Sequence, residues 1–294
     1  MKLLITGASS TLGKNLTSEI LKVSNISVRL LEHRSPLQRE SCETFKADLQ
    51  HEESLIQACS GINIVIHLAA LTHSISGKSY FEVNEAGTEN LIRACQKNRV
   101  KQFIYISSAA ASEEGGEYGV SKLRGEEKVK NSTLDWMILK PSEIYGSKME
   151  KGIGQLISWV KRFPVIPVIG DGSYFLSPVY VDDIVQAIME VLKKDTFGKK
   201  TLNLCGPEEV TMNELIDRIA SYNNVRRKKL FLPVVLVRFA IGFLSFFKSN
   251  LAFSDQIPRL LCEKDRTLDV TKTEILYSPR KIEEGLMLLQ PKIN

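Results

Sequence analysis

Short apolar runs alternate with longer segments of helical periodicity through the first half of the chain. Each run is continuous rather than alternating, which is typical of a strand that is buried on both faces of a parallel sheet. The expected strands are Leu3–Ile5, Ile26–Leu31, Phe45–Leu49, Asn63–Leu68, Val100–Ser107 and Trp136–Leu139. The expected helices between them are Thr11–Val23, Glu52–Cys59, Tyr80–Lys97 and Tyr118–Lys130. This alternation predicts an α/β fold with a doubly wound parallel sheet.

The pattern changes after Gly146, where proline and glycine interrupt the chain more often. The further elements expected there are a helix over Gly152–Arg162, a helix over Asp182–Lys193, a strand over Lys200–Cys205 and a helix that ends at Tyr222. Thr211 followed by Glu214 predicts a capping box at the start of that last helix. Residues 147–178 and 206–294 are therefore expected to form a smaller C-terminal lobe, with residues 179–205 returning to the main sheet.

The apolar stretch Leu230–Phe247 follows the basic run Arg226–Lys229 and is close to the length of a membrane span. Pro233 and Arg238 argue against a span, because a cation at the centre of a bilayer costs about 3 kcal/mol. A buried helix of the smaller lobe or a subunit contact is the favoured interpretation. Contact with a membrane surface is the alternative.

Composition limits the function classes further. The chain has 294 residues and a net charge of +5, which is too weakly basic to indicate a nucleic-acid partner. Its five cysteines form no CxxC pair and its four histidines have no ligand spacing, so we expect neither disulfides nor a metal site. Met1 leads directly into the first strand, and we therefore expect a cytoplasmic protein without a signal peptide.

A glycine-bearing turn joins the first strand to the first helix. Gly7 and Gly13 flank Ser10, where the usual dinucleotide fingerprint has its middle glycine. Such a turn directs backbone N–H groups and the positive end of a helix at one point, which favours a pyrophosphate. Residues 1–146 are thus expected to form a Rossmann-type dinucleotide-binding domain.

Two features bear on which dinucleotide would bind. Glu32, at the end of the second strand, is placed to meet ribose hydroxyls, whereas Arg34 and its neighbour His33 would suit a 2′-phosphate. The carboxylate favours NAD over NADP. Ala69 and Ala70, after the fourth strand, would let a flat ligand approach the backbone, although close packing of helix on strand explains small residues equally well.

Tyr118 and Lys122 lie one helical turn apart on the same face of an expected helix. An ammonium close to a phenol stabilises the phenolate, which makes the tyrosine a usable proton donor and acceptor. Ser107 and Ser108 follow the preceding strand, where a hydroxyl is placed to bind a carbonyl oxygen.

Taken together, the chain resembles the extended short-chain dehydrogenase/reductase family, the NAD-dependent epimerase/dehydratase group. The segments that carry the resemblance are TGASSTLG (Thr6–Gly13), AD (Ala47–Asp48), HLAA (His67–Ala70), NEAGT (Asn84–Thr88), YISSA (Tyr105–Ala109), YGVSK (Tyr118–Lys122), KPSEIYG (Lys140–Gly146) and VYVDD (Val179–Asp183). The resemblance implies that Tyr118 is the catalytic acid/base, that Lys122 binds the nicotinamide ribose, and that Ser108 orients the substrate carbonyl. Besides Glu32 and Arg34, named above, it further implies cofactor contacts from Gly7, Ser10, Thr11, Leu12, Asp48, Leu49, Leu68, Ala69, Ala70, Pro141 and Ile144.

Departures from the family pattern narrow the expected activity. Dehydratases carry an Asp–Glu pair where Ala109 and Ala110 follow Ser108, so dehydration is disfavoured. Leu176 stands where members that act on sugar nucleotides usually place an arginine, and Lys140 replaces another arginine. The expected function is an NAD(P)-dependent oxidoreductase or epimerase that acts on a secondary alcohol or ketone of a nucleotide-sugar.

Two alternatives stay open. The short loop before Tyr118 resembles the branch that includes an accessory subunit of respiratory complex I, which suggests a non-catalytic NADP(H)-binding scaffold. A reductase of a lipid or isoprenoid-type ketone is the other, because the region Phe231–Phe247 is apolar. Family members often dimerise through helices equivalent to Tyr80–Lys97 and Tyr118–Lys130, so a homodimer is also expected.

Overall fold

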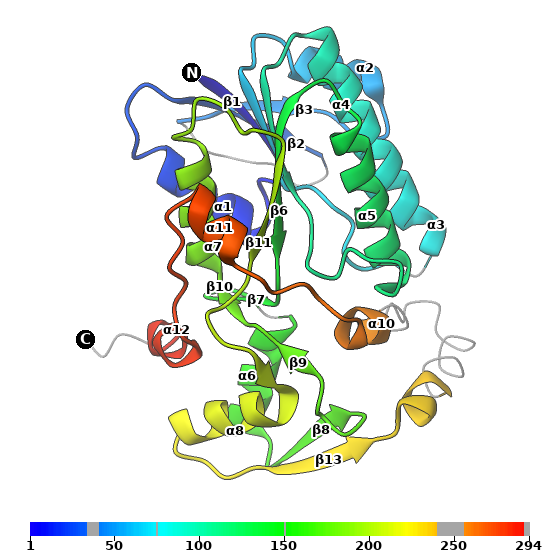
Figure 1. Cartoon of the computed structure of the whole chain (residues 1–294), viewed down its shortest axis with the longest axis vertical. Helices are drawn as coiled ribbons and strands as arrows, with labels where there is room; N and C mark the ends of the chain where they lie inside the picture. Colours follow the sequence, from blue (N-terminus) through cyan, green and yellow to red (C-terminus); the bar gives the residue numbers. More distant parts are fainter. Residues whose placement is uncertain (34–40, 75, 150, 240–255, 291–294) are drawn as a thin grey trace.

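A seven-stranded parallel sheet forms the centre of the protein (Figure 1). The computed structural model describes residues 1–33, 41–74, 76–149, 151–239 and 256–290. The strands are β1 (Lys2–Thr6), β2 (Ser27–Glu32), β3 (Glu43–Lys46), β4 (Ile64–His67), β5 (Gln102–Ile106), β6 (Asp135–Pro141) and β11 (Lys200–Leu204). Their spatial order is β11-β6-β5-β4-β1-β2-β3. The predicted doubly wound, Rossmann-type sheet is confirmed.

The strand order reverses at β1, which pairs with β2 on one side and β4 on the other. Leu3 of β1 lies opposite both Val28 of β2 and Ile64 of β4. In open parallel sheets, ligands bind beyond the carboxyl ends of the strands at such a switch point. The fold therefore directs attention to the turns that follow β1 and β4.

Helices cover both faces of the sheet, as Figure 1 shows. Helices α1 (Thr11–Ile20) and α7 (Val181–Val191) pack together on one face, and α2 (Glu52–Ala58), α4 (Gly87–Lys97) and α5 (Gly116–Lys130) on the other. Leu3 and Ile5 belong to the core under α1 and α7, whereas Leu4 belongs to the opposite core. This division follows from the period of two along a strand and explains why the runs are apolar throughout.

The long helix predicted over Tyr80–Lys97 is divided into three pieces, α3 (Gly77–Tyr80), the π-helix η1 (Phe81–Ala86) and α4. Within η1, the side-chain amide of Asn84 accepts from the backbone N–H of Leu71 (2.8 Å) and donates to its carbonyl oxygen (3.0 Å). The backbone carbonyl of Asn84 accepts from Thr88 Oγ1 (2.7 Å). These bonds compensate for the interrupted helical ladder. The helix predicted over Thr11–Val23 likewise ends sooner, at Ile20.

A smaller group of elements lies below the sheet in Figure 1. Its main elements are α6 (Ile153–Arg162), β8 (Val165–Ile169), α8 (Met212–Tyr222) and β13 (Lys228–Leu232). Shorter pieces connect the two parts, namely β7 (Ile144–Tyr145), β9 (Phe175–Leu176), β10 (Val179–Tyr180), β12 (Val210–Thr211), α10 (Gln256–Leu261), α11 (Asp269–Glu274) and α12 (Ile282–Leu288). The capping box between Thr211 and Glu214 is confirmed. Ile166 and Val168 share one apolar core with Leu3 of the sheet, and the domain boundaries given above stay a prediction.

The interpretation of Leu230–Phe247 as a buried helix is wrong for the part that the structure describes. Leu230–Leu232 belongs to β13, which pairs in parallel with β8, and residues 234–239 form one helical turn. Leu230, Val235 and Phe239 are exposed by 53%, 76% and 72%. Residues 240–247 lie outside the described residues. Within the described chain, no helix combines the length and the apolar character that crossing a bilayer requires.

Candidate active site

The turn between β1 and α1 is shaped by two glycines. Gly7 has a φ of +68°, and a Cβ there would lie 2.7 Å from the backbone nitrogen of Ala69. A Cβ on Gly13 would lie 2.5 Å from the carbonyl oxygen of Gly7. Glycine at position 7 therefore lets the turn pack against the end of β4, and glycine at position 13 lets α1 pack against the turn itself.

Ser10 acts as the N-cap of α1. Its hydroxyl donates to the carbonyl oxygen of Gly7 (2.8 Å) and accepts from the backbone N–H of Gly13 (3.0 Å). The N–H groups of Thr11 and Leu12, in the first turn of the helix, have no acceptor within the helix itself. This combination of backbone donors and a positive helix end suits an anion.

A buried histidine connects the first turn to the end of β4. His67 Nδ1 lies 2.7 Å from Thr6 Oγ1, and its Nε2 lies 3.1 Å from Thr88 Oγ1. Thr6 Oγ1 also accepts from the N–H of Ala69 (3.1 Å), which holds the predicted segment Leu68–Ala70 beside Gly7. Burial, aided by the Lys122 cation, lowers the pKa of His67 to about 3, so the ring is neutral at physiological pH.

Tyr118 and Lys122 are both buried on α5, with exposed fractions of 5% and 1%. Lys122 Nζ donates to the carbonyl oxygen of Ile106 (2.8 Å) and lies 4.1 Å from the centroid of the Tyr105 ring. Burial lowers the pKa of Lys122 to about 7, against the opposing effect of Glu126. The ammonium is thus held against the carboxyl end of β5.

The Tyr–Lys pair and the glycine turn belong to one site. The Tyr105 ring that Lys122 covers lies 5.6 Å from the His67 ring, centroid to centroid, and His67 is bonded to Thr6 at the end of β1. The carboxyl ends of β1, β4 and β5 therefore converge here, as the switch point leads one to expect.

The two serines after β5 have different roles. Ser107 Oγ donates to the buried Glu126 carboxylate (2.6 Å), which also receives Lys140 at 3.3 Å. Ser108 Oγ accepts from the N–H of Ala110 (3.1 Å), and the hydroxyl hydrogen of Ser108 is not used in that bond. Ser107 is buried, whereas Ser108 is half-buried.

The other predicted cofactor residues follow the strand ends. Glu32 ends β2 and Pro141 ends β6, while Ile144 opens β7. Leu49 is buried and packs close to Gly87, where an added Cβ would lie 2.9 Å from the Leu49 Cβ.

The residues around the expected adenine position are partly engaged with one another. Asp48 Oδ2 lies 3.1 Å from His33 Nε2, and its Oδ1 accepts from the N–H of Gln50 (3.0 Å). The predicted contact at Arg34 lies outside the described residues.

Arg259 is a functional candidate that the sequence did not suggest. Its guanidinium carbon lies 3.8 Å from the centroid of the Tyr118 ring, and Nη1 donates to the carbonyl oxygen of Thr72 (2.9 Å). The residue comes from α10, which packs on α5. No periodicity or motif around Arg259 indicates this position, because only the folded chain brings α10 to α5.

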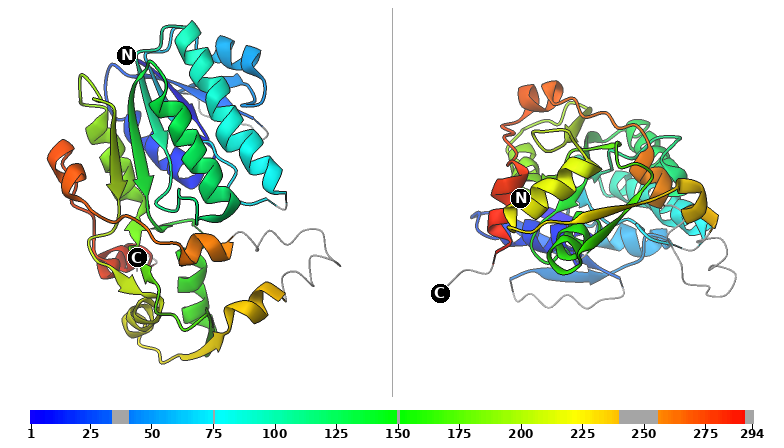
Figure 2. Two further views of the ribbon diagram at one scale, coloured as in Figure 1. Left: turned by 45° about the vertical axis from the view of Figure 1, so that its right-hand side comes forward. Right: turned by 90° about the horizontal axis from the view of Figure 1, so that it is seen from below.

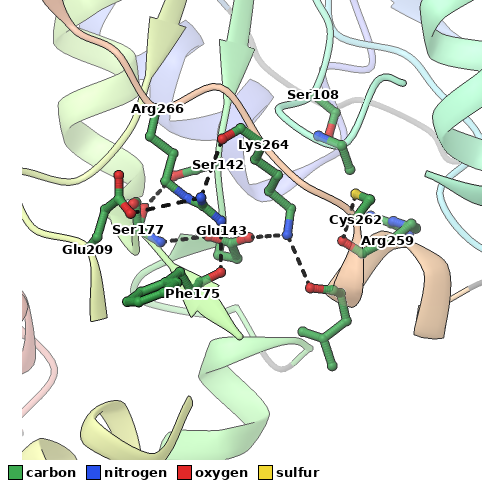
Figure 3. A network of polar contacts seen from close by, with 12 residues as sticks. Ser108, Ser142, Glu143, Phe175, Ser177, Glu209, Arg259, Cys262, Lys264 and Arg266 are labelled. Carbon is green, nitrogen blue, oxygen red and sulfur yellow. Dashed lines mark hydrogen bonds and ion pairs between the residues drawn. The ribbon is translucent and has the colours of Figure 1, made fainter. Parts of the chain in front are cut away.

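A buried ion pair holds the segment after α10 in place, as Figure 3 shows. Lys264 Nζ lies 3.1 Å from Glu143 Oε1 and donates to the carbonyl oxygen of Leu260 (3.3 Å). Glu143 Oε2 accepts in turn from the N–H of Ser177 (3.0 Å). Lys264 thus fixes α10, and with it Arg259, to the loop after β6.

Comparison with known proteins agrees with this geometry. The NAD dependent epimerase/dehydratase family model matches residues 3–205. The N-acetyl-alpha-D-glucosaminyl-diphospho-ditrans,octacis-undecaprenol 4-epimerase of Escherichia coli O157:H7 is 26% identical over 79% of this chain and 76% of that protein. The mitochondrial NADH dehydrogenase [ubiquinone] 1 alpha subcomplex subunit 9 of Arabidopsis thaliana is 28% identical over 59% of this chain and 44% of its own length.

The crystal structure of a Bacillus cereus UDP-glucuronic acid 4-epimerase mutant, bound to NAD and a fluorinated UDP-sugar, shares the fold. Its TM-score is 0.78 at 22% identity, over 97% of this chain and 96% of that one. With the family model matching residues from β1 through β11 and the same fold in a solved epimerase, the chain belongs to the NAD dependent epimerase/dehydratase family.

Proposed function

We propose that the protein binds NAD(P), with a preference for NAD, and interconverts a secondary alcohol and a ketone on a nucleotide-sugar. The reaction is then an epimerisation or an oxidoreduction. The observation that carries this proposal is the pair of buried residues Tyr118 and Lys122, which contacts through Tyr105 and His67 connect to the end of β1 at the switch point.

The residues present fit a dinucleotide. Gly7 and Gly13 allow a compact turn, because backbone atoms occupy the space that a Cβ at either position would need. The first-turn N–H groups of α1, which follow this turn, suit a pyrophosphate. Lys122 is an almost fully buried ammonium that donates to the backbone carbonyl of Ile106, and ribose hydroxyls would supply further acceptors for its three donors. Glu32 at the end of β2 suits the hydroxyls of an adenosine ribose, which supports the preference for NAD.

The chemistry assigned to the chain's own residues is one proton transfer plus positioning. When bound, NAD would accept a hydride at its nicotinamide ring and return it. Tyr118 would take the proton from the substrate hydroxyl and give it back to the ketone, and Ser108 would donate a hydrogen bond to the same oxygen. Lys122 would stabilise the phenolate of Tyr118.

A substrate with a diphosphate group is supported by Arg259. One guanidinium N–H donates to the Thr72 carbonyl, and the group lies over the Tyr118 ring. A guanidinium has five N–H donors, so others would be available to a substrate that approaches the phenol. Arg259 would thus supply a cation that Leu176 does not. Dehydration stays disfavoured because Ala109 and Ala110 follow Ser108.

A second candidate is the same reaction on a sugar diphosphate carried by a lipid. Two observations favour it: the Escherichia coli relative is named for an undecaprenol-linked sugar, and apolar side chains of β13 are exposed. A non-catalytic scaffold is less favoured, although the plant relative is named as a subunit of a larger assembly, because a scaffold does not require Ser108, Tyr118 and Lys122 together.

The test combines cofactor identification with one substitution. The purified protein is denatured, released NAD or NADP is identified, and UDP-sugars are then followed for epimerisation or for a change in nicotinamide absorbance. Tyr118→Phe is expected to lower kcat by at least about 100-fold while leaving NAD binding unchanged. Tyr222→Phe, at the far end of α8, serves as the matched control.

Three results would count against the proposal. Tyr118→Phe with full activity would remove the acid/base role. Failure to bind either NAD or NADP would contradict the proposed cofactor. Activity on undecaprenyl-diphosphate sugars but not on UDP-sugars would favour the second candidate.

A further inference from the structure

We propose that the protein docks on the surface of a lipid bilayer that carries anionic headgroups, through an apolar and basic face of the smaller lobe. This face, called the β13 surface, consists of Phe163, Val165, Pro167, Leu230 and the helical turn 234–239. It lies at the end of the molecule farthest from α2, as Figures 1 and 2 show. The inference goes beyond the proposed function and does not depend on it.

The register of the β8–β13 pair shows why its outer face is apolar. Val165 lies opposite Lys228 and Pro167 opposite Leu230. In a parallel pair, residues in register share a face, and neighbours along each strand point to the other face. Val165 and Leu230 are exposed by 42% and 53%, whereas Ile166 and Val168 between them are buried in the main core. One face of this small sheet holds the lobe together, and the other presents apolar side chains to the exterior.

The helical turn directly after β13 adds further exposed apolar side chains. Val235, Leu236 and Phe239 are exposed by 76%, 63% and 72%. Seven of the fifteen exposed large apolar side chains in the described residues lie within 163–165 and 230–239. A contiguous concentration of this kind marks an interaction surface, whereas scattered exposed apolar residues do not.

The charged residues on the two segments that carry these apolar side chains have one sign. Segments 161–169 and 226–239 contain seven lysines and arginines and no aspartate or glutamate. Lys161, Arg162, Arg226, Lys228 and Arg238 are exposed, while Lys229 is engaged by Asp217 at 2.7 Å. Cations beside exposed leucine, valine and phenylalanine are the composition of a surface that lies in the headgroup region.

Charge complementarity decides between a bilayer and a second copy of the chain. In a two-fold contact, the same patch would face itself and oppose its cations to one another. Anionic headgroups neutralise these cations, and the apolar side chains between them enter the acyl boundary. The occupant assigned to the β13 surface is therefore an anionic membrane.

The test is sedimentation of the full-length protein with vesicles. We expect binding to vesicles of phosphatidylglycerol mixed with phosphatidylcholine, weak binding to phosphatidylcholine alone, and a decrease as salt is raised. The triple variant Val235→Ser, Leu236→Ser, Phe239→Ser should lower the partition coefficient at least about tenfold. Lys228→Gln should lower it about fivefold.

Leu276→Ser is the matched control, because Leu276 is 81% exposed but lies outside the β13 surface. It should bind as the unaltered protein does, and thermal unfolding of every variant verifies that each is folded. The proposal is overturned if the triple variant binds equally well, or if the unaltered protein does not bind anionic vesicles. It is also overturned if, without lipid, the same substitutions abolish a dimer, since the surface would then be a contact between copies.

Discussion

The guanidinium carbon of Arg259 lies 3.8 Å from the centroid of the Tyr118 ring, although 141 positions separate the two residues in the sequence. The contact covers one face of the proposed acid/base with a cation and leaves Tyr118 only 5% exposed. It joins α10 to α5 and so places the C-terminal part of the chain at the site. The guanidinium therefore lies directly against the proposed acid/base.

Arg259→Ala should weaken binding of a diphosphate-containing substrate. Charge-assisted hydrogen bonds contribute about 1.5–3 kcal/mol, so KM should rise about tenfold or more, with kcat less affected. Steady-state kinetics with a UDP-sugar measure both constants. Arg238→Ala, which removes an exposed arginine of the smaller lobe, should leave KM unchanged. An unaltered KM in Arg259→Ala would exclude a substrate contact.

Gly7→Ala should reduce both stability and cofactor binding. The new Cβ would need a positive φ and would lie 2.7 Å from the nitrogen of Ala69. Gly61→Ala is a matched control, because Gly61 has almost the same φ, +70°, with no heavy atom within 4 Å of an added Cβ. Chemical unfolding should show a loss of about 1–2 kcal/mol for Gly61→Ala and a larger loss for Gly7→Ala. NAD affinity, measured by calorimetry, should fall only in Gly7→Ala, and equal effects of the two substitutions would contradict the close approach.

Glu32→Ser should shift the cofactor preference toward NADP. The carboxylate at the end of β2 suits ribose hydroxyls and repels a 2′-phosphate, so its removal should lower the ratio of NAD to NADP affinity about tenfold. Binding titrations with both dinucleotides measure this ratio. Glu19→Ser, on the exposed side of α1, is the control. An unchanged ratio would mean that Glu32 does not face the adenosine ribose.

The sheet and its switch point were predictable because local sequence determines them. Buried parallel strands require continuous apolar runs such as Leu3–Ile5, and the turn at Gly7 requires glycine for steric reasons. Tyr118 and Lys122 follow from spacing on a single helix. Each of these features is contained within a few neighbouring residues.

The errors concern features that depend on distant partners. Leu230–Leu232 forms a strand because β8 offers it a partner more than sixty residues earlier, and hydropathy alone cannot distinguish that from a buried helix. The π-helix around Asn84 depends on bonds to Leu71. The position of Arg259 depends on the packing of α10 against α5, and the Lys264–Glu143 pair joins the segment after α10 to the loop after β6. No local sequence pattern predicts either contact.

Breaking the Lys264–Glu143 ion pair should lower the free energy of unfolding far more than breaking an exposed ion pair does. The Lys264 and Glu143 side chains are exposed by only 3% and 17%, so removing one partner leaves the other charge in a poorly solvated place. We expect Lys264→Met to lower the free energy of unfolding by about 3 kcal/mol. Lys22→Met, which breaks the exposed pair with Glu19, should cost less than about 1 kcal/mol.

A double-mutant cycle separates this pair from general packing effects. Lys264→Met combined with Glu143→Gln should cost less than the sum of the two single changes, by about 1 kcal/mol or more. Because Lys264 fixes α10, Lys264→Met should also raise KM in the manner of Arg259→Ala. Additive stabilities together with an unchanged KM would show that the pair neither couples nor positions Arg259.

His67 should make the protein sensitive to acid. Burial lowers its folded pKa to about 3 from 6.5, so between these values the unfolded chain binds a proton that the folded chain does not. The contribution of His67 is complete above 6.5 and is lost as the pH falls toward 3, at up to about 1.4 kcal/mol per pH unit. His67→Asn keeps a polar side chain that does not titrate, so its stability should fall less steeply over this range.

Denaturant unfolding at a series of pH values gives both slopes, and His51→Asn, at an exposed position before α2, should retain the steeper one. Parallel curves for the unaltered protein and His67→Asn would mean that His67 is protonated in the folded state, with both ring nitrogens donating, to Thr6 and to Thr88.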